Sequence, residues 1–338
     1  MVKIKNEGIV LTARNFEFEK RGVFNPTCIS ERGSTHMFYR AVDTRGTSKI
    51  GYAEVNGNKE LKRLNHPILE PEKDYEIRGI EDPRITNLNN TYYMYYVALD
   101  SSSNARLAMA VSQNLHQWTK EGLVGPNITY QEAEKIIDRR VVNQGYGYFL
   151  DYFGEKRGEA YLYEKSGGLF PKKIRGKLAL FHRIHPGIQV AYAKDFSEFK
   201  DDRFWRDHLS NIGDFIIMNP RQPWEGEVIG MGSVPIETDE GWLVIYYGSK
   251  KNGEDRVFRV GAALLDLENP QKEIGRLQQP LFEPREEWEI KGRVPDVVFP
   301  SGAIVKDGRI WIYYGAADTV VAAKSVGLND LLLEIKKS

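Results

Sequence analysis

Hydrophobic and polar positions along the chain follow a pattern that recurs five times. Each copy begins at a proline and continues through a β-prone stretch, a polar turn and a strand rich in aromatic or aliphatic residues. The five prolines are Pro26, Pro83, Pro171, Pro235 and Pro300. Two β-prone stretches joined by a short polar turn are typical of a β-hairpin. The clearest predicted turns are Asn89-Asn90, Arg175-Gly176, Glu240-Gly241 and Asp307-Gly308.

Each predicted hairpin is followed by a third strand and, in two copies, by a candidate fourth strand. The third strands begin at Ile50, Ala105, Ile188, Arg259 and Ala322, and the candidate fourth strands cover residues 67–71 and 280–284. Successive prolines lie 57, 88, 64 and 65 residues apart. Regularly repeated four-stranded units are typical of a β-propeller. The sequence therefore predicts one all-β domain over residues 1–338, a five-bladed β-propeller whose ring is closed by residues 8–18 and the last strand.

The long interval between the second and third prolines contains an insertion of different character. Residues 129–147 have a helix-forming composition and follow the third strand of the second unit. We therefore expect a helical insertion after the second blade, within about residues 125–163. Its many charged residues fit a solvated helix. The alternative is a lid or an oligomer contact that narrows the site on the aglycone side and sets the preferred chain length.

Composition and charge limit the partners of such a domain. The chain has 338 residues, with 47 lysines and arginines against 47 aspartates and glutamates, so a broad basic surface for nucleic acid is not expected. The first residues lack the apolar run of a secretory signal, and no stretch of about 18 apolar residues suggests a membrane span. These features predict a cytoplasmic protein that binds neither nucleic acid nor a membrane.

Cysteine and histidine give no indication of a metal site. Cys28 is the single cysteine, which excludes an intramolecular disulfide and a cysteine-based zinc site. Among the six histidines, only His182 and His185 lie close together in sequence, and an offset of three residues on a strand points two side chains to opposite faces. We therefore expect no metal and no organic cofactor.

The residues near the five prolines are the candidates for chemistry, because the first strand of each propeller blade lines the central channel. The most pointed candidate is the run Glu81-Asp82-Pro83-Arg84. Adjacent side chains on a strand face opposite sides of the sheet, so we expect only one of the two carboxylates to face the channel. The alternative is a turn-forming Asp-Pro step with a local ion pair to Arg84.

Several segments of the chain, taken together, resemble one family of carbohydrate-active enzymes. They are residues 24–27, 79–86, 169–177, 181–184, 240–246 and 297–302, with the sequences FNPT, GIEDPRIT, LFPKKIRGK, FHRI, EGWLVIY and VVFPSG. This combination is similar to glycoside hydrolase family 130, and the resemblance extends from about Phe24 to Asp318. That family contains inverting β-mannoside phosphorylases and β-mannosidases on a five-bladed propeller. The resemblance therefore implies an enzyme that cleaves β-mannosides.

The resemblance also implies roles for individual residues. Asp82 would be the general acid and would deliver its proton through a hydroxyl of the bound mannose. Tyrosine and tryptophan side chains at the mouth of the channel would stack on sugar faces, although most single tyrosines are expected to pack the blades. The residues implied in substrate binding are Asn25, Arg40, Asp43 and Asp296, with Arg84 and Tyr247 as further candidates.

Either phosphate or water could attack the sugar, and the resemblance points to four positions that bear on this choice. Family members that use phosphate carry cations at these positions, because an anion needs fixed positive partners. Lys165 and Arg183 match two of the positions. Val228 and Tyr247 stand where a lysine and a histidine are usual. Half of the expected cations are therefore missing.

Two glutamates lie near this incomplete cation site. Glu227 adjoins Val228, and Glu225 precedes Glu227 by two residues. A carboxylate at this place would repel phosphate and could activate water. Inverting hydrolysis needs an acid and a base about 6.5–9.5 Å apart. We therefore predict an inverting β-mannosidase with Asp82 as the acid and Glu227 or Glu225 as the base, acting on β-1,2- or β-1,4-linked manno-oligosaccharides.

Two alternatives stay open at this point. The first is phosphorolysis, in which Lys165 and Arg183 hold inorganic phosphate as co-substrate and mannose 1-phosphate is the product. The second is a non-catalytic propeller that only binds sugar. In every case the expected partner is a small oligosaccharide, and the sequence leaves a homo-oligomer open.

Overall fold

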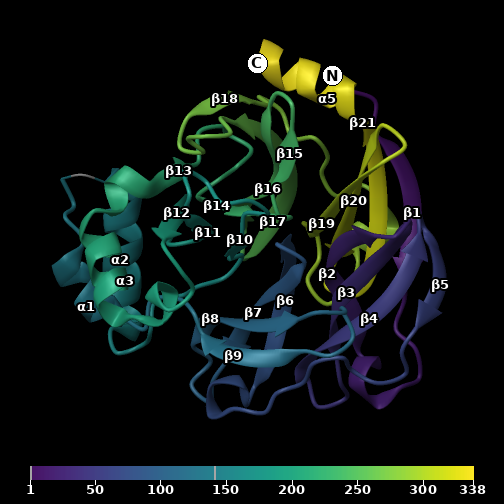
Figure 1. Ribbon diagram of the computed structural model, residues 1–338, viewed down its shortest axis with the longest axis horizontal. Helices are drawn as coiled ribbons and strands as arrows, with labels where there is room; N and C mark the ends of the chain where they lie inside the picture. Colours follow the sequence, from purple (N-terminus) through teal and green to yellow (C-terminus); the bar gives the residue numbers. More distant parts are fainter. Residues whose placement is uncertain (1, 141) are drawn as a thin grey trace.

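Five antiparallel groups of strands make up most of the described chain, which comprises residues 2–140 and 142–338 of a computed structural model (Figure 1). Group 1 consists of β2 (Gly22–Glu31), β3 (Ser34–Val42), β4 (Ser48–Asn56) and β5 (Lys59–Arg63). Group 2 consists of β6 (Gly79–Leu88), β7 (Thr91–Leu99), β8 (Ala105–Ser112) and β9 (Thr119–Leu123). Group 3 consists of β10 (Gly168–Leu169), β11 (Leu178–His182), β12 (Ile188–Ala193) and β13 (Ile216–Met218).

The last two groups come from the C-terminal part of the chain and from its first strand. Group 4 consists of β14 (Val228–Met231), β15 (Ile236–Thr238), β16 (Gly241–Asn252), β17 (Asp255–Leu265) and β18 (Glu273–Arg276). Group 5 consists of β19 (Val298–Lys306), β20 (Arg309–Ala316), β21 (Val320–Gly327) and β1 (Lys5–Leu11). Figure 1 shows the groups following one another around the centre of the molecule.

Hydrogen bonding connects the described strands into four sheets rather than five. A single parallel bridge between Ser48 and Gly79 joins β4 of group 1 to β6 of group 2, so these two groups count as one sheet. A side chain at position 79 would prevent this approach, because a Cβ there would lie 2.8 Å from the backbone nitrogen of Ser48. The prediction of a mostly β protein is confirmed, whereas the closed five-bladed ring stays a prediction.

The third strands follow the predicted repeat, and so do the hairpins except in group 3, where the stretch after Pro171 forms only an isolated bridge between Ile174 and Lys177. The fourth strands do not follow it. β5 and β18 pair with the third strands of groups 1 and 4. The predicted segments 67–71 and 280–284 instead contribute isolated bridges, at Leu69 and Phe282. Each segment begins and ends with a proline, which lacks the N–H donor that a strand ladder needs. The prediction of fourth strands at these positions is therefore wrong.

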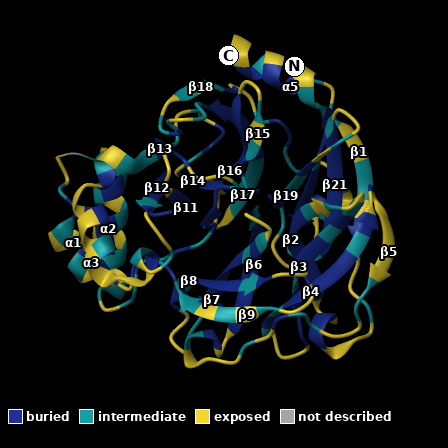
Figure 2. Ribbon diagram, viewed as in Figure 1, coloured by how far each residue is buried: buried dark blue, intermediate teal, exposed yellow. Residues whose placement is uncertain are grey.

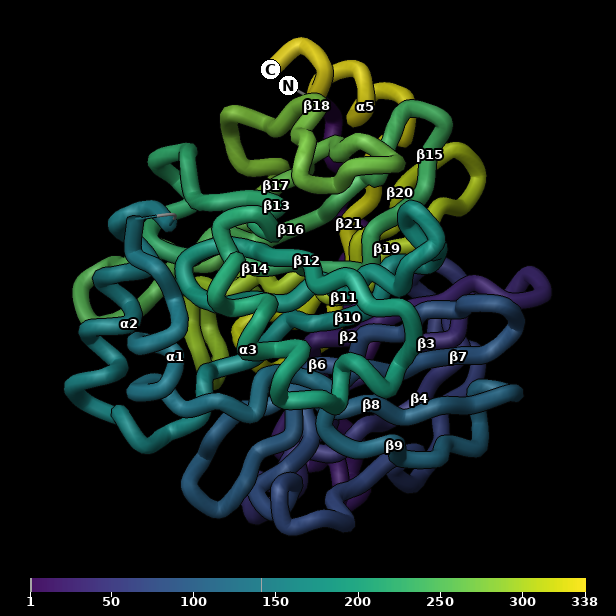
Figure 3. Tube along the Cα trace, turned by 60° about the vertical axis from the view of Figure 1, so that its left-hand side comes forward, coloured from purple at the N-terminus to yellow at the C-terminus, as the bar shows by residue number. Residues whose placement is uncertain are grey.

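Both ends of the chain attach to groups 4 and 5. β1 pairs antiparallel with β21, which confirms that N-terminal residues complete the last group. The predicted last strand ends at Gly327, and α5 (Leu328–Lys337) follows it. Leu331, Leu332 and Ile335 on α5 belong to the core cluster shared by groups 4 and 5. Figure 3 shows α5 beside β18.

Three helices gather at one side of the molecule (Figure 1). α1 (Tyr130–Ile136) and α2 (Gln144–Arg157) lie within the predicted insertion, which confirms its helical character. Thr129 and Glu132 form a capping box that starts α1, and Asn143 caps α2. The sequence pattern did not predict α3 (Asp202–Ser210), which packs against α1. None of the described helices has the length and apolar character needed to cross a membrane.

Four fully buried glutamates occupy equivalent places in groups 1, 2, 4 and 5, in the segment before the first strand of each group. They are Glu19, Glu76, Glu225 and Glu289. Each carboxylate accepts a hydrogen bond of 2.5–2.8 Å from a tyrosine on the middle strand of its group; the donors are Tyr39, Tyr96, Tyr246 and Tyr314. Each is also paired with a cation; the partners are Arg63, Lys120, Arg276 and Lys324. We call each set a buried carboxylate cluster.

Residues next to each buried carboxylate cluster supply further hydrogen bonds to the carboxylate or leave room for the tyrosine. In groups 2, 4 and 5 the carboxylate also accepts the N–H groups of the residues three and four positions earlier, so it fixes the turn that leads into the first strand. A Cβ at Gly51 would lie 2.2 Å from the ring of Tyr39. In each of the four groups, the residue on the third strand that pairs with the tyrosine is small, which leaves room for the phenol to reach its carboxylate. The four small residues are Gly51, Ala108, Gly261 and Ala322.

Group 3 builds the corresponding contact from histidines. Glu164 is buried, and its Oε1 lies 3.1 Å from Nδ1 of His182 on β11. Nε2 of His182 lies 2.8 Å from Nε2 of His208 on α3, so one of these two nitrogens carries the shared proton. Burial, and next the neighbouring His182, hold the pKa of His208 well below its usual range. His208 is therefore uncharged at neutral pH.

Buried residues predominate along the strands, and exposed residues concentrate in the turns and on the helices (Figure 2). Aliphatic and aromatic residues from neighbouring groups meet in shared clusters, such as Val23 and Met37 of group 1 with Val321 of group 5. Burial of this apolar surface is the main favourable contribution to folding. It also surrounds the carboxylate clusters, so their charges have little access to water.

We expect the loss of one cluster hydroxyl to destabilise the fold. Tyr96→Phe leaves the buried Glu76 without its phenol donor, which should lower the free energy of unfolding by about 1–3 kcal/mol. Denaturant unfolding followed by circular dichroism measures this change. Tyr148→Phe removes the hydroxyl of an exposed tyrosine and should leave stability unaltered. Equal stability of Tyr96→Phe and the unmodified protein would contradict the importance of the cluster.

Candidate active site

Asp82, the predicted general acid, lies in a distorted part of β6. The register between β6 and β7 shifts at Asp82-Pro83, and Asp82 has a left-handed φ of 50°. Asn25 occupies the same kind of distortion in β2, with a φ of 47°. This backbone conformation is rare for residues other than glycine, and asparagine and aspartate tolerate it best. It brings the two side chains together, because Asn25 Nδ2 donates a hydrogen bond of 2.8 Å to Asp82 Oδ1.

Arg40 on β3 contacts both carboxylates of the Glu81-Asp82 pair. Its guanidinium is ion-paired with Glu81 and lies 3.8 Å from Asp82 Oδ1, and its Nε donates to Ser48 Oγ over 2.8 Å. The expectation that the two carboxylates face opposite sides is therefore wrong. The left-handed backbone at Asp82 interrupts the alternation of side chains along the strand. Glu81 and Asp82 belong to one site.

Lys165 lies on the other side of Glu81 from Arg40. It donates a hydrogen bond of 2.9 Å to Glu81 Oε2, and its Nζ lies 5.5 Å from the centre of the Tyr163 ring. Burial alone would raise the pKa of Glu81, but the charges of Arg40 and Lys165 outweigh burial and hold it well below its usual range. Burial opposes the charge on Lys165, yet Glu81 raises the pKa of Lys165. Both groups therefore stay charged at neutral pH.

Asp318 is a residue of this site that the sequence analysis missed. It follows β20 and has a left-handed φ of 51°. Burial raises the pKa of its carboxyl, and the charges that act on it next are those of Arg40, Asp82 and Lys165. A signal was available in the sequence, because residues 41–44 and 316–319 are AVDT and AADT and stand at the ends of β3 and β20.

Asp43 and Asp296, both predicted to bind the sugar, have different surroundings. The carboxylate of Asp43 is buried and accepts the N–H groups of Arg45 and Thr47 at 3.0 and 2.8 Å, so it stabilises the turn between β3 and β4. Asp296 has a left-handed φ of 58°, and its side chain is half-buried. Among the described residues, its carboxylate has no hydrogen-bond partner. Asp296 is therefore free to bind a ligand, whereas Asp43 is committed to the fold.

Arg84 supports the backbone on which Asp82 lies. Its guanidinium is fully buried and donates to the carbonyl oxygens of Asp82 at 3.1 Å, Pro83 at 3.0 Å and Gly232 at 2.5 Å. Burial lowers the pKa of Arg84 to about 10. These contacts tie the distorted part of β6 to group 4. Arg84 therefore positions Asp82 through its backbone. It bonds to the carbonyl oxygen of Asp82 and not to the Asp82 carboxylate, as the alternative of a local ion pair would require.

Arg183 and Tyr247 form a second polar centre next to Lys165. Arg183 Nη1 donates to Tyr247 Oη over 2.8 Å, and Ser166 Oγ lies 3.0 Å from the same oxygen. The Tyr163 ring is near both cations: its centre lies 5.5 Å from Lys165 Nζ and 6.0 Å from the Arg183 guanidinium carbon. Tyr247 thus holds Arg183 from the position where the resemblance predicts a histidine.

The two glutamates predicted as alternative bases lie in unlike surroundings. Glu225 belongs to the buried carboxylate cluster of group 4, where Tyr246 and Arg276 take up its charge. Glu227 is partly exposed and ion-paired with Arg256 over 2.8 Å. Glu225 therefore does not lie with the other candidate residues. Glu227 forms an ion pair with Arg256.

Glu227 lies on the wall of a cavity of about 430 Å³ between the helical insertion and group 4. α2 contributes a row of aromatic residues to this wall, which are Tyr148, Phe149, Tyr152 and Phe153. The facing wall carries Val228 and Phe258, and Tyr163 and Arg183 connect the cavity to the Lys165 centre. An aromatic wall opposite charged groups is suited to a sugar ring, which has apolar faces and a polar edge. The insertion therefore borders the candidate site, as the lid interpretation requires.

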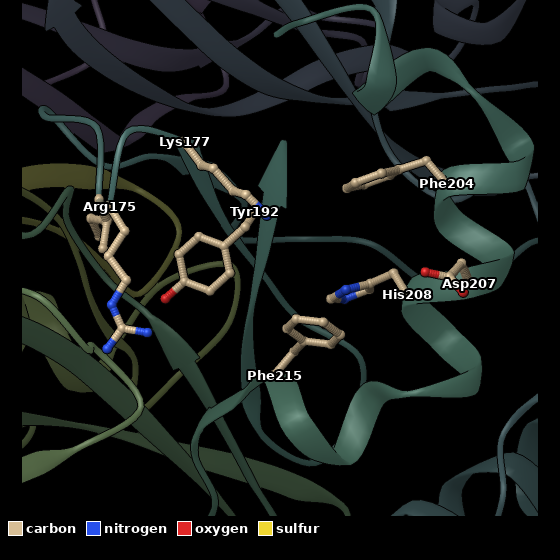
Figure 4. A pocket seen from close by; sticks show the side chains of 8 residues that line it. Arg175, Lys177, Tyr192, Phe204, Asp207, His208 and Phe215 are labelled. Carbon is tan, nitrogen blue, oxygen red and sulfur yellow. The ribbon is translucent and has the colours of Figure 1, made fainter. Parts of the chain in front are cut away.

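A second cavity, of about 300 Å³, lies between α3 and group 3 (Figure 4). Figure 4 shows Phe204, Asp207 and His208 entering it from α3, opposite Tyr192 on β12. The residues predicted for catalysis line other parts of the molecule. Within the described chain, no group of three or more histidine, cysteine, aspartate and glutamate side chains is placed to hold a metal ion.

Comparisons with known proteins agree on one family. Its model, described as beta-1,4-mannooligosaccharide phosphorylase, matches residues 3–337. The 1,2-beta-oligomannan phosphorylase of Thermoanaerobacter sp. (strain X514) is 32% identical, over 98% of this chain and 99% of its own. The beta-1,2-mannobiose phosphorylase of the same organism is 33% identical, over 94% of each chain.

A solved structure extends the comparison to hydrolases. It is described as showing that the GH130 family of mannoside phosphorylases contains glycoside hydrolases that target beta-1,2 mannosidic linkages in Candida mannan. It superimposes with a TM-score of 0.75 at 24% identity, over 97% of this chain and 94% of its own. At this identity the likeness concerns the fold alone.

We expect Glu225 to act in stability and not in turnover. Glu225→Gln leaves Arg276 with Glu273 as its remaining counter-charge and removes the buried carboxylate that accepts the Arg221 and Gln222 N–H groups, which should lower the free energy of unfolding by about 1–3 kcal/mol. Glu227→Gln is the matched control, because its ion pair is partly exposed and should contribute less than about 1 kcal/mol. Thermal and denaturant unfolding of both variants provide the measurement. If Glu225→Gln had normal stability but no turnover, the expectation would be contradicted and Glu225 would again be a candidate for the catalytic base.

Proposed function

The chain belongs to glycoside hydrolase family 130, and on this premise we propose that it cleaves β-linked mannosides by phosphorolysis. A phosphate oxygen attacks the anomeric carbon of the terminal mannose, and the bond from that carbon to the leaving oxygen breaks with inversion. The products are mannose 1-phosphate and the shortened oligosaccharide. The two relatives at about one third identity are both named phosphorylases, which favours this alternative of the sequence analysis over hydrolysis.

The observation that carries the proposal is the state of the two candidate bases. Hydrolysis needs a carboxylate that is free to accept a proton from water. Glu225 is enclosed by Tyr246 and Arg276, and Glu227 is paired with Arg256. Phosphate is already an anion at neutral pH and needs no such base. It needs cations, and Lys165 and Arg183 both lie within about 6 Å of the centre of the Tyr163 ring.

Hydrolysis is the second candidate, because two expected cation positions hold other residues. Val228 and Tyr247 stand where the resemblance predicts a lysine and a histidine. Tyr247 bonds to Arg183 and so keeps a role in the anion site. Val228 contributes no charge, and this position is the main argument for water as the nucleophile.

We assign the general acid to Asp82. Its Oδ1 is held by Asn25 and faces Arg40, while Oδ2 has no hydrogen-bond partner among the described residues. The free oxygen donates its proton to the leaving oxygen through a hydroxyl of the bound mannose. The residues that surround the sugar in this proposal are Asn25, Arg40, Asp296 and Asp318, with Asp43 and Arg84 in support of the backbone.

The proposed substrates are small manno-oligosaccharides with β-1,2 linkages, since both relatives carry this linkage in their names. The family model is described by the β-1,4 linkage, so a β-1,4-linked substrate is the comparison to include. We infer further that the five strand groups are the blades of a five-bladed propeller. The repeated carboxylate clusters and the pairing of β1 with β21 support this architecture.

Phosphate dependence distinguishes the two reactions. We expect mannose 1-phosphate to form from β-1,2-mannobiose only when inorganic phosphate is present, because the cations of the site bind the nucleophile. Chromatography of the products with and without phosphate measures the outcome. Release of free mannose at the same rate in both conditions would support hydrolysis and reject the proposal.

Loss of the acid should remove most of the activity. Asp82→Asn keeps the shape and the left-handed backbone of the residue but cannot donate the proton, so we expect kcat to fall by about 10²–10⁴-fold. Asp307→Asn is the matched control, since Asp307 has the same φ of 50° in the turn between β19 and β20. Steady-state kinetics of both variants test the assignment. Normal turnover by Asp82→Asn would remove Asp82 from the chemistry.

A further inference from the structure

The cavity beside α2 has more positive than negative groups on its wall. Four cationic side chains line it, together with a single carboxylate among the described residues. The cations are Arg157, Arg183, Lys251 and Arg256, and the carboxylate is Glu227. An excess of fixed positive charge in a partly enclosed site favours an anion. This excess lies next to Val228, the position where the family resemblance predicts a lysine.

Arg256 is held firmly against the strand that pairs with Val228. Its Nε donates to Ser249 Oγ over 2.7 Å, and its Nη2 donates to Ser249 O over 3.1 Å and to Glu227 over 2.8 Å. Ser249 on β16 is the cross-strand partner of Val228 on β14. The guanidinium of Arg256 is therefore anchored at the register position of Val228, although it comes from β17.

Arg183 and Arg256 on this wall keep donors that no protein group uses. Nη2 of Arg183 makes no hydrogen bond within the described chain, although the residue as a whole is buried. Nη1 of Arg256 likewise makes no hydrogen bond within the described chain. An unpaired buried donor is costly unless a ligand or water satisfies it. Two guanidinium groups with open donors on one cavity match the oxygens of a phosphate.

Arg183 and Arg256 both influence the same neighbouring side chain, His185. Its ring lies in the same cavity, 5.0 Å from the ring of Phe149. Burial lowers the pKa of His185 well below its usual range, and the next causes are the charges of Arg183 and Arg256. A bound phosphate would offset these two charges. His185 is therefore a natural probe for an anion at this site.

We propose that Arg256 is a phosphate-binding residue, which supplies from β17 the cation that Val228 does not provide. Glu227 then acts as a positioning residue that orients Arg256, and it is not the base of a hydrolase. This inference rests on the proposed phosphorolysis and assigns its phosphate site. The site takes inorganic phosphate in the forward direction and the phosphoryl group of mannose 1-phosphate in the reverse direction.

Replacement of Arg256 should weaken phosphate binding and leave the sugar unaffected. For Arg256→Met we expect KM for phosphate to rise at least tenfold, with KM for β-1,2-mannobiose changed less than twofold. Arg259→Met is the matched control, because Arg259 lies on the same strand and pairs with Glu283 outside this cavity. A phosphate-dependent protein whose KM for phosphate is the same with and without Arg256 would overturn the assignment of Arg256. Phosphate-independent release of mannose would instead overturn the proposed function.

A gain of charge at position 228 provides the complementary test. Val228→Lys in the Arg256→Met background should restore at least half of the lost phosphate affinity, because it returns a cation to the same register position. Glu227→Gln should keep phosphate-dependent turnover and raise KM for phosphate only a few-fold. Loss of turnover in Glu227→Gln with an unchanged KM for phosphate would show that Glu227 is not a positioning residue.

Binding can also be followed without turnover. Addition of inorganic phosphate alone should raise the pKa of His185 in histidine NMR spectra of the unmodified protein. The same addition should have at least tenfold weaker effect on Arg256→Met. A response to mannose 1-phosphate at the same histidine would identify the two ligands with one site. An equal response of both proteins to phosphate would contradict a role for Arg256.

Discussion

A buried carboxylate must be neutralised where it lies, and the rest of this molecule is arranged around that requirement. Glu19 and Glu76 each meet a tyrosine and a cation of their own group before the first strand begins. The left-handed residues Asn25 and Asp82 follow these glutamates at the same distance along the chain, six residues later. The clusters therefore fix the starting point of β2 and β6. The hydrogen bond between Asn25 and Asp82 is a consequence of that placement.

The balance of positive and negative side chains changes from the surroundings of Asp82 to the cavity beside α2. Around Asp82, carboxylates and cations are mixed, and Arg40 and Lys165 are largely satisfied by Glu81. Beyond Tyr163, the cations keep unused donors and only one carboxylate accompanies them among the described residues. A neutral sugar and a phosphate anion need such different surroundings. The overall balance of 47 positive and 47 negative residues conceals this local separation.

The repeat of the sequence was sufficient to predict the hairpins outside group 3, the third strands and the helical insertion, because these depend on local hydrophobic pattern and turn residues. It could not predict that Glu81 and Asp82 share one site, since this depends on a left-handed backbone within a strand. Glu225 looked like a base because it lies near Val228 in sequence. The signal against this interpretation was the recurrence of a glutamate before the first strand, in company with a tyrosine on the middle strand.

Among its described residues, group 3 lacks the tyrosine and the lysine or arginine that neutralise the buried glutamate in the other four groups. This difference affects the charges of the candidate site. Group 3 supplies Lys165 and Arg183, while the glutamate between β9 and β10, Glu164, contacts His182 instead of a tyrosine and a permanent cation. His182 in turn contacts His208. Glu164 directly precedes Lys165, and its Oε2 accepts the N–H of Arg183 at 3.5 Å. A permanent cation at this place would compete with Lys165 and Arg183 for any anion. The imidazole of His182 hydrogen-bonds the buried carboxylate, and His208 hydrogen-bonds that imidazole in turn. No lysine or arginine side chain is paired with Glu164 in the described chain, which leaves Lys165 and Arg183 as the cations that an incoming anion meets.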